Sequence, residues 1–161
     1  AAAVSSQVIA MDQSYAAWEL NLRNLVLSTG ATVTMQFSFD NGSTYKSGAS
    51  DYSCGGFFQG NTTTTNVTWA TASGINVLPA LSSGSGVGGG AMVTSRISSK
   101  AGAETQVRNE FLHFDATHGA GRVDGAYSAS TNATNYGKAT HVKILVSGGT
   151  MTFDYSLMGL P

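Results

Sequence analysis

Apolar and polar residues alternate along much of this chain, which is the two-residue period of a β-strand with one buried face. The clearest run lies at residues 32–39, where every second residue is apolar, and it ends at an Asp-Asn-Gly sequence, residues 40–42. Asn-Gly supplies the positive φ angles of a tight turn. The pattern therefore predicts a strand, a reversal of the chain, and then an edge segment or loop from Tyr45 to Tyr52.

The segment from Ala16 to Leu25 has two interpretations. Ala16, Trp18, Leu20 and Leu22 alternate with polar or small residues, which indicates a strand. Trp18, Leu22 and Leu25 also fall at helical spacing, and Ala, Leu and Glu are good helix formers. We predict a strand, because the run that follows it is so clearly a strand, and a helix is the alternative.

Further strands are expected in the rest of the chain. Residues 60–90 predict two short strands, whose inward residues are Val67, Trp69, Ile75, Val77 and Leu78. Other strands are expected at residues 93–97 and 107–114, and residues 119–137 are interpreted as loop. Two alternating runs at 141–146 and 151–157, separated by Gly148-Gly149, predict a closing strand pair.

These elements define the expected fold class. They amount to about eight to ten strands with no convincing long helix, which predicts an all-β, antiparallel β-sandwich of jelly-roll-like form. The chain has 161 residues, with no internal repeat and no linker of the composition that marks a domain boundary. We therefore expect a single sandwich domain over residues 1–161.

Composition and charge limit the kinds of partner that we expect the protein to bind. Charged residues make up 11% of the chain, against roughly 25% in an average soluble domain. Such a neutral polar surface is common in proteins that work outside the cell or pack against copies of themselves. The net charge is −1 and the eight basic residues are scattered, so we expect no nucleic-acid partner.

Apolar runs and cysteine content exclude two further kinds of architecture. No apolar run reaches the roughly 18 residues that span a bilayer, so membrane insertion is not expected. The opening Ala1–Val4 lacks the charged start and long apolar stretch of a signal peptide, so we expect a mature chain or a fragment. Cys54 is the single cysteine, which excludes an intrachain disulfide and is typical of a small buried residue.

One short group of residues could hold a metal. His113, Asp115 and His118 are close in sequence, and His113 and Asp115 would share a face of a strand. No obvious third ligand accompanies them, so we expect surface or loop residues, with no metal and no cofactor. A metal site is the alternative.

Catalytic signatures are missing from the sequence. Gly84, Gly86 and Gly89 formally match the pattern G-x-G-x-x-G, but no strong strand leads into it and no amphipathic helix follows. No G-x-S-x-G elbow is present, and the nine acidic residues show no distinctive paired pattern. We therefore expect a protein that is not an enzyme.

Aromatic residues outside the alternating pattern are the candidate binding residues. We expect them in or beside loops, where exposed rings stack on sugars or anchor protein contacts. Their alternative role is to cover the edges of the sheets. The candidates for a glycan or protein contact are Tyr52, Phe57, Phe58, Tyr127 and Tyr136.

Three stretches carry patterns of a more specific kind. Residues 15–26 form an aromatic-containing strand pattern that reaches Asn-Leu-Val, residues 35–52 form a hairpin pattern with a Ser-Gly step before its final Tyr, and residues 149–161 close with Gly-Leu-Pro. Together they resemble a small domain of tail-associated proteins in tailed bacteriophages. Residues 60–90 match only in character, and Leu27 stands where that family often has a proline.

The resemblance implies a function. It implies a structural component of a tailed-phage virion, in a tail appendage or tail fibre, which contributes to assembly or to attachment to the host surface. It also implies other virion proteins as partners, a homo-oligomer with a trimer favoured, and a host surface glycan as a further partner. The alternatives are a capsid decoration protein and a free carbohydrate-binding module.

Overall fold

The secondary structure of the chain is made of strands. The computed structural model describes residues 2–59, 64–78, 90–115, 121–131 and 137–161, and these residues contain no helix, hence none able to cross a membrane. The eleven strands within them are β1 (Ser6–Ala10), β2 (Ala17–Leu27), β3 (Val33–Ser38), β4 (Tyr52–Gln59), β5 (Thr64–Ala72), β6 (Ile75–Leu78), β7 (Ala91–Ser98), β8 (Gln106–Asp115), β9 (Gly121–Thr131), β10 (His141–Val146) and β11 (Met151–Leu160).

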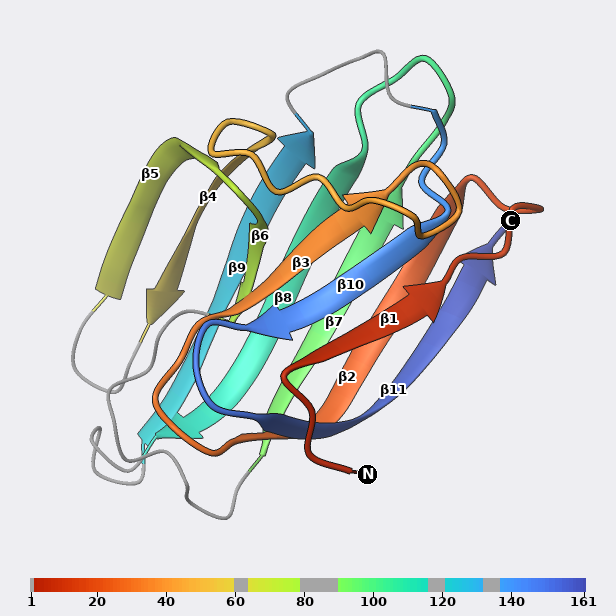
Figure 1. The fold of residues 1–161 in the computed structure, drawn as a ribbon. Helices are drawn as coiled ribbons and strands as arrows, with labels where there is room; N and C mark the ends of the chain where they lie inside the picture. Colours follow the sequence, from red (N-terminus) through yellow and green to blue (C-terminus); the bar gives the residue numbers. More distant parts are fainter. Residues whose placement is uncertain (1, 60–63, 79–89, 116–120, 132–136) are drawn as a thin grey trace.

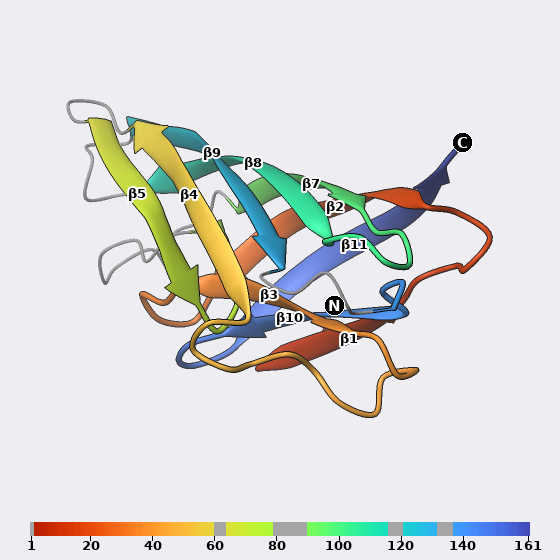
Figure 2. The same ribbon diagram turned by 90° about the horizontal axis from the view of Figure 1, so that it is seen from above.

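The strands form two sheets that lie face to face, as Figure 1 shows. The smaller sheet has four strands in the order β1-β10-β3-β6, and the larger has seven in the order β11-β2-β7-β8-β9-β4-β5. Every pairing between these strands is antiparallel. Seen from above, the two layers are stacked with their strands running at an angle (Figure 2). The expected all-β antiparallel sandwich is therefore confirmed.

The path of the chain is that of a jelly roll with additions. From β1 to β4 the chain alternates between the sheets, and it returns to the smaller sheet at β6 and again at β10. Without β8, β9 and β11, the order would be β1-β10-β3-β6 facing β2-β7-β4-β5, which is the arrangement of an eight-stranded jelly roll. Here β8 and β9 lie between β7 and β4, and β11 extends the larger sheet beyond β2.

One apolar core fills the space between the sheets. The segment from Ala16 is a strand, as predicted, and its alternate residues Trp18, Leu20 and Leu22 are fully buried. Because β2 pairs with β7 on one side and β11 on the other, the two-residue period outweighs its helical propensity. The smaller sheet contributes Val33, Met35, Phe37, Ile75, Val142 and Ile144 to the same core.

Two expectations about strands are wrong. Residues 121–131, interpreted as loop, form β9, which pairs with β8 and β4 inside the larger sheet. Its only large apolar residues are Val123 and Tyr127, so it lacks the alternation that marks a strand. The closing strand pair is also wrong, because β10 belongs to the smaller sheet and β11 to the larger, and Gly148-Gly149 connects the two layers.

Buried hydroxyl groups join the strand ends at one end of the sandwich. Ser99 Oγ lies 2.7 Å from Thr105 Oγ1 and accepts a hydrogen bond from the Ala139 N–H at 2.9 Å. Thr131 Oγ1 accepts one from the Thr105 N–H at 3.0 Å. These side chains follow β7, precede β8 and end β9, so they satisfy backbone groups that the sheet ladder no longer reaches.

A bulge interrupts β2 near its middle. The step from Leu22 to Leu25 lies opposite the shorter step from Val93 to Ala91 in β7, so β2 has one extra residue there. Asn24 adopts a φ of 53°, and its Nδ2 donates a hydrogen bond to Asp154 Oδ2 at 3.0 Å. Asn tolerates this left-handed backbone region better than most residues, and the bulge increases the local twist of the sheet.

Replacement of Asn24 tests the importance of this conformation. Asn24→Val is expected to lower the free energy of unfolding by about 1 to 2 kcal/mol, because a β-branched side chain is strained at positive φ. Asn24→Gly should stay within about 0.5 kcal/mol of the parent, because glycine adopts this φ freely. Urea unfolding of both variants measures the difference. Equal losses for Val and Gly would show that the side-chain hydrogen bond, not the backbone, is what matters.

Candidate functional site

The five candidate aromatic residues do not lie in loops as a group. Tyr52, Phe57 and Phe58 lie in β4, and Tyr127 lies in β9. All of Tyr136 lies outside the described residues, and so do the side chains of Phe58 and Tyr127. The structure therefore decides the exposure of two candidates, Tyr52 and Phe57.

Tyr52 is a buried structural residue. Its ring is fully buried, and its hydroxyl accepts a hydrogen bond from the Phe37 N–H at 2.8 Å and donates one to the Lys46 carbonyl at 3.1 Å. Phe37 lies in β3 beyond the last residue that pairs with β6, so this N–H has no partner from β6. Tyr52 thus links the two sheets where the chain crosses between them, and its ring is not available to a sugar.

Phe57 is the exposed aromatic candidate. Its side chain is 49% exposed on the outer face of the larger sheet. It pairs with Ala126 of β9, which pairs in turn with Glu110 of β8, so two strand spacings, about 10 Å, separate Phe57 from Glu110. An apolar ring and a carboxylate therefore lie on the same broad surface.

Two pairs of opposite charges lie on this outer face. Arg96 Nε lies 3.5 Å from Glu19 Oε2, and Arg108 lies 3.0 Å from Glu110 Oε1. These exposed pairs contribute little to stability, since surface ion pairs are worth at most about 1 kcal/mol. Their effect is on the electrostatics of the face, because in these two pairs the positive charge has a negative neighbour that offsets its field.

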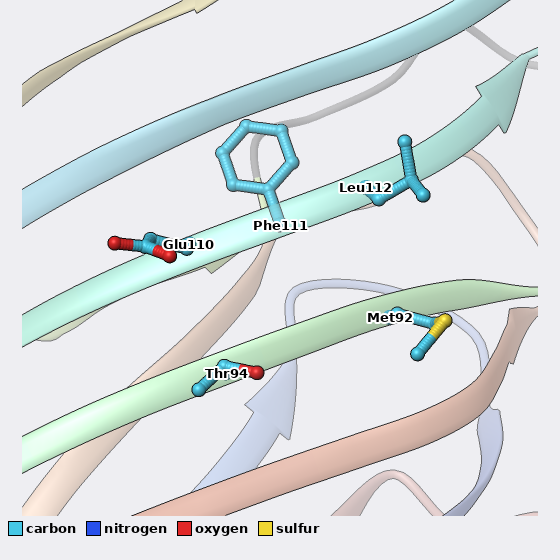
Figure 3. A pocket seen from close by; sticks show the side chains of 5 residues that line it. All are labelled: Met92, Thr94, Glu110, Phe111 and Leu112. Carbon is cyan, nitrogen blue, oxygen red and sulfur yellow. The ribbon is translucent and has the colours of Figure 1, made fainter.

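A shallow depression lies on the same face. It has a volume of about 240 Å³ and is lined by residues of β7 and β8 (Figure 3). Met92, Phe111 and Leu112 form its apolar part, and Thr94 and Glu110 add a hydroxyl and a carboxylate. Met92 is 54% exposed. The depression could accept a ligand with both apolar and hydroxyl groups, although it is open and not an enclosed active site.

The predicted metal-capable group cannot be placed. The side chains of His113 and Asp115, and all of His118, lie outside the described residues. Among the side chains that the structure does describe, no three His, Cys, Asp or Glu residues gather to form a metal site. Cys54 is buried, as expected for a lone cysteine with an apolar role.

The loop between β3 and β4 folds back over the smaller sheet. Asn41 and Gly42 have φ angles of 57° and 83°, so the predicted turn is present. It does not join two paired strands, because β3 pairs with β10 and β6. The Lys46 N–H instead donates to the Phe37 carbonyl at 3.0 Å, and Lys143 Nζ lies 4.7 Å from the centre of the Tyr45 ring.

Asp40 organises the first part of this loop. Its carboxylate accepts hydrogen bonds from the Thr44 hydroxyl at 2.6 Å, the Thr44 N–H at 2.9 Å and the Ser38 hydroxyl at 2.7 Å. These donors, those of Thr44 first, lower the pKa of Asp40 from its ordinary value of 3.8 to about 2. The ionised carboxylate therefore holds the turn closed.

Comparison of the chain with protein-family models, with curated proteins and with solved structures finds no match. The candidate surface therefore rests on the geometry described above.

Sequence reasoning missed the depression between β7 and β8. Met92 and Leu112 are opposed across the two strands, but they lie 20 positions apart, and the pairing of β7 with β8 was not predicted. The one available signal was an apolar residue on the polar face of an alternating strand, since Met92 precedes the buried Val93.

Acid should weaken the turn that Asp40 holds. Because its pKa is lowered on folding, Asp40 stabilises the fold fully above about pH 4, and this contribution is lost as the pH falls towards about 2. Asp40→Asn should therefore be less stable than the parent at pH 5, and the gap should narrow by pH 2. Thermal unfolding midpoints across this range measure it, and Thr44→Val should shift the loss to higher pH. A gap independent of pH would contradict this role of the carboxylate.

Proposed function

We propose that this chain is a structural component of a tailed-phage virion, a tail-appendage or tail-fibre module that contributes to assembly or to attachment at the host surface. Other virion proteins are its proposed partners, and the role is not catalytic. The resemblance of residues 15–26, 35–52 and 149–161 to tail-associated domains is what indicates the phage context.

The observation that carries the attachment role is the outer face of the larger sheet. It combines an exposed ring, Phe57, with a shallow, mostly apolar depression and with two pairs of opposite charges. A sugar presents hydroxyl groups and an apolar C–H face, and a flat ring meets that face without desolvating a charge. The geometry therefore supports contact with a neutral surface glycan better than contact with a charged ligand.

Self-association belongs to the same proposal. Low charge reduces the desolvation penalty when two copies meet, and sheet edges that lack a neighbour invite another strand. Phage appendages are usually symmetric, and the resemblance favours a trimer. A homo-oligomer would present several copies of the face at once, which raises the strength of attachment without a new contact.

The position of the protein in the particle tests the virion role. Antibodies raised against the folded chain are expected to decorate the tail or its appendages in electron micrographs of the intact phage. Decoration spread over the capsid would favour the capsid decoration protein instead. Antibodies that bind only free protein, with no labelled particles, would contradict the virion role.

Replacement of Phe57 tests the attachment role. Phe57→Ala is expected to weaken binding of the chain to host cells or isolated surface polysaccharide by about 1 to 3 kcal/mol, the range for a well-placed stacking anchor. Phe57→Trp should retain binding, because it keeps a flat ring at the same place.

Tyr52→Phe is the matched control for this experiment. It removes the hydroxyl that bonds Phe37 and Lys46, so it should lower stability by about 1 to 3 kcal/mol without changing glycan affinity. If Phe57→Ala folds and binds like the parent, the ring covers the sheet and does not contact the host.

A further inference from the structure

Strand β11 is a long edge that remains open. It lies at the end of the larger sheet, and among the described residues β2 is its only neighbouring strand; its ten residues exceed the length of the other edge strands β1, β5 and β6. Natural sheets protect such edges with lysines, prolines or short strands. β11 contains no Lys, Arg or Pro, and its one charge, Asp154, accepts a hydrogen bond from Asn24 of β2.

The hydrogen-bonding groups on the free side of β11 can be identified. The Thr150 carbonyl accepts from the Ser28 N–H on the β2 side, whereas both backbone groups of Met151 pair on the opposite side with Val4, at 2.8 and 2.9 Å. Successive residues of a strand direct these groups to alternate sides. The groups that point away from β2 are therefore those of Met151, Phe153, Tyr155, Leu157 and Gly159.

The bridge to Val4 shows what this edge accepts. Val4 pairs with Met151 in antiparallel orientation, and the chain then leaves to form β1 in the other sheet. Beyond Met151, no strand of the described residues continues along the edge from Phe153 to Gly159. The edge of β11 therefore already pairs with one residue of an antiparallel segment, at Met151. The seven residues from Phe153 to Gly159 are left for another strand.

Apolar side chains flank the open edge on both faces. Tyr155 lies on the inward face of β11 but is 44% exposed, on the side of the sandwich where β1 and β11 are the edge strands of the two sheets (Figure 1). Met158 is 49% exposed on the outward face, and Leu157 packs partly against the core. The ring of Tyr15, itself 37% exposed, lies directly over Gly159.

We propose that β11 pairs antiparallel with β11 of a second copy of this chain, about a twofold axis at Ser156. The two larger sheets then form one continuous sheet across the contact. The partner is a second copy because the edge is complementary to itself in a single register.

That register follows from the two ends of the strand. With the axis at Ser156, Tyr155 lies opposite Leu157 of the second copy and Phe153 opposite its Gly159, so all four open residues are paired. A shift towards the start of β11 would need Met151, which Val4 already occupies. A shift towards the end would need Pro161, which has no N–H to donate.

The side chains of β11 are also compatible with this register. On the outward face the two Ser156 side chains meet at the axis, and each Asp154 lies opposite Met158 of the second copy. The two Asp154 carboxylates are therefore not opposed, so the pairing places no like charges together. On the inward face Tyr155 and Leu157 gain cover on the open side of the sandwich.

The inference rests on the edge alone and not on the proposed virion role. A twofold contact closes at a dimer, whereas the resemblance favours a trimer, so the two are distinguishable in solution. Loss of host binding in Phe57→Ala would leave the β11 contact untouched, because Phe57 lies in β4 at the far side of the larger sheet.

Disulfide cross-linking tests the register directly. In Ser156→Cys the two introduced thiols would meet across a non-hydrogen-bonded pair with Cα atoms about 4.5 Å apart, within disulfide range, so mild oxidation should yield a covalent dimer. The native Cys54 is buried and adds little background. Thr152→Cys is the control, since it lies on the same face but about 27 Å from its copy in this register.

Charge substitutions at the twofold axis test the contact through the equilibrium between monomer and dimer. Ser156→Asp and Ser156→Lys should each raise the dimer dissociation constant about tenfold in sedimentation experiments, and a mixture of the two should recover heterodimers. Met158→Lys should tighten the dimer, because it places a cation opposite Asp154 of the second copy. Retained strand content by circular dichroism shows that the variants fold.

A monomer at all concentrations up to about 100 µM, near the weak limit for a specific contact, would overturn the proposal. So would equal cross-linking by Ser156→Cys and Thr152→Cys, or a trimer that Ser156→Asp leaves intact. Dimers that respond to both charge variants, with cross-linking at Ser156 alone, would establish it.

Discussion

The need to satisfy backbone hydrogen bonds wherever a strand leaves its sheet constrains this structure most strongly. The chain crosses between layers many times, and a buried N–H left unpaired where a ladder ends costs about 1 to 3 kcal/mol. Hydroxyl groups accept hydrogen bonds from three such N–H groups at or near strand ends: Tyr52 from Phe37, Thr131 from Thr105, and Ser99 from Ala139. The abundance of Ser and Thr in this chain thus has an interior use as well as a surface one.

Alternation of apolar residues reliably predicted the strands that bury large apolar side chains in the core. It located the segments that became β2, β3, β7, β10 and β11, and buried residues recur at every second position along β7 and β10. It failed for β9 and for most of β4, whose Gly, Ala and Ser residues form strands because their neighbours β8 and β5 supply partners. Pairing with distant segments, not local pattern, decides those two strands.

The candidate site shows the same division between local and distant information. Residue type identified the aromatic candidates but could not separate the buried Tyr52 from the exposed Phe57, five positions later in the same strand. Tyr52 is buried and Phe57 is exposed because alternate side chains of a pleated strand point to the core and to the outer face. Likewise, the depression beside Met92 exists only because β7 and β8 are neighbours in one register.

Pairing of β1 with β10 has a consequence for how the chain is made. Ser6 pairs with Leu145 and Val4 pairs with Met151, so β1 must wait for residues about 140 positions later in the chain before its ladder can form. At 5 to 20 residues per second, β1 waits on the order of 10 s with its hydrogen-bonding groups and Ile9 unprotected. The smaller sheet is therefore completed only after β10 has been synthesised, and a nascent chain of this protein has a long interval in which β1 is accessible to chaperones or to the open edges of neighbouring chains on the same polysome.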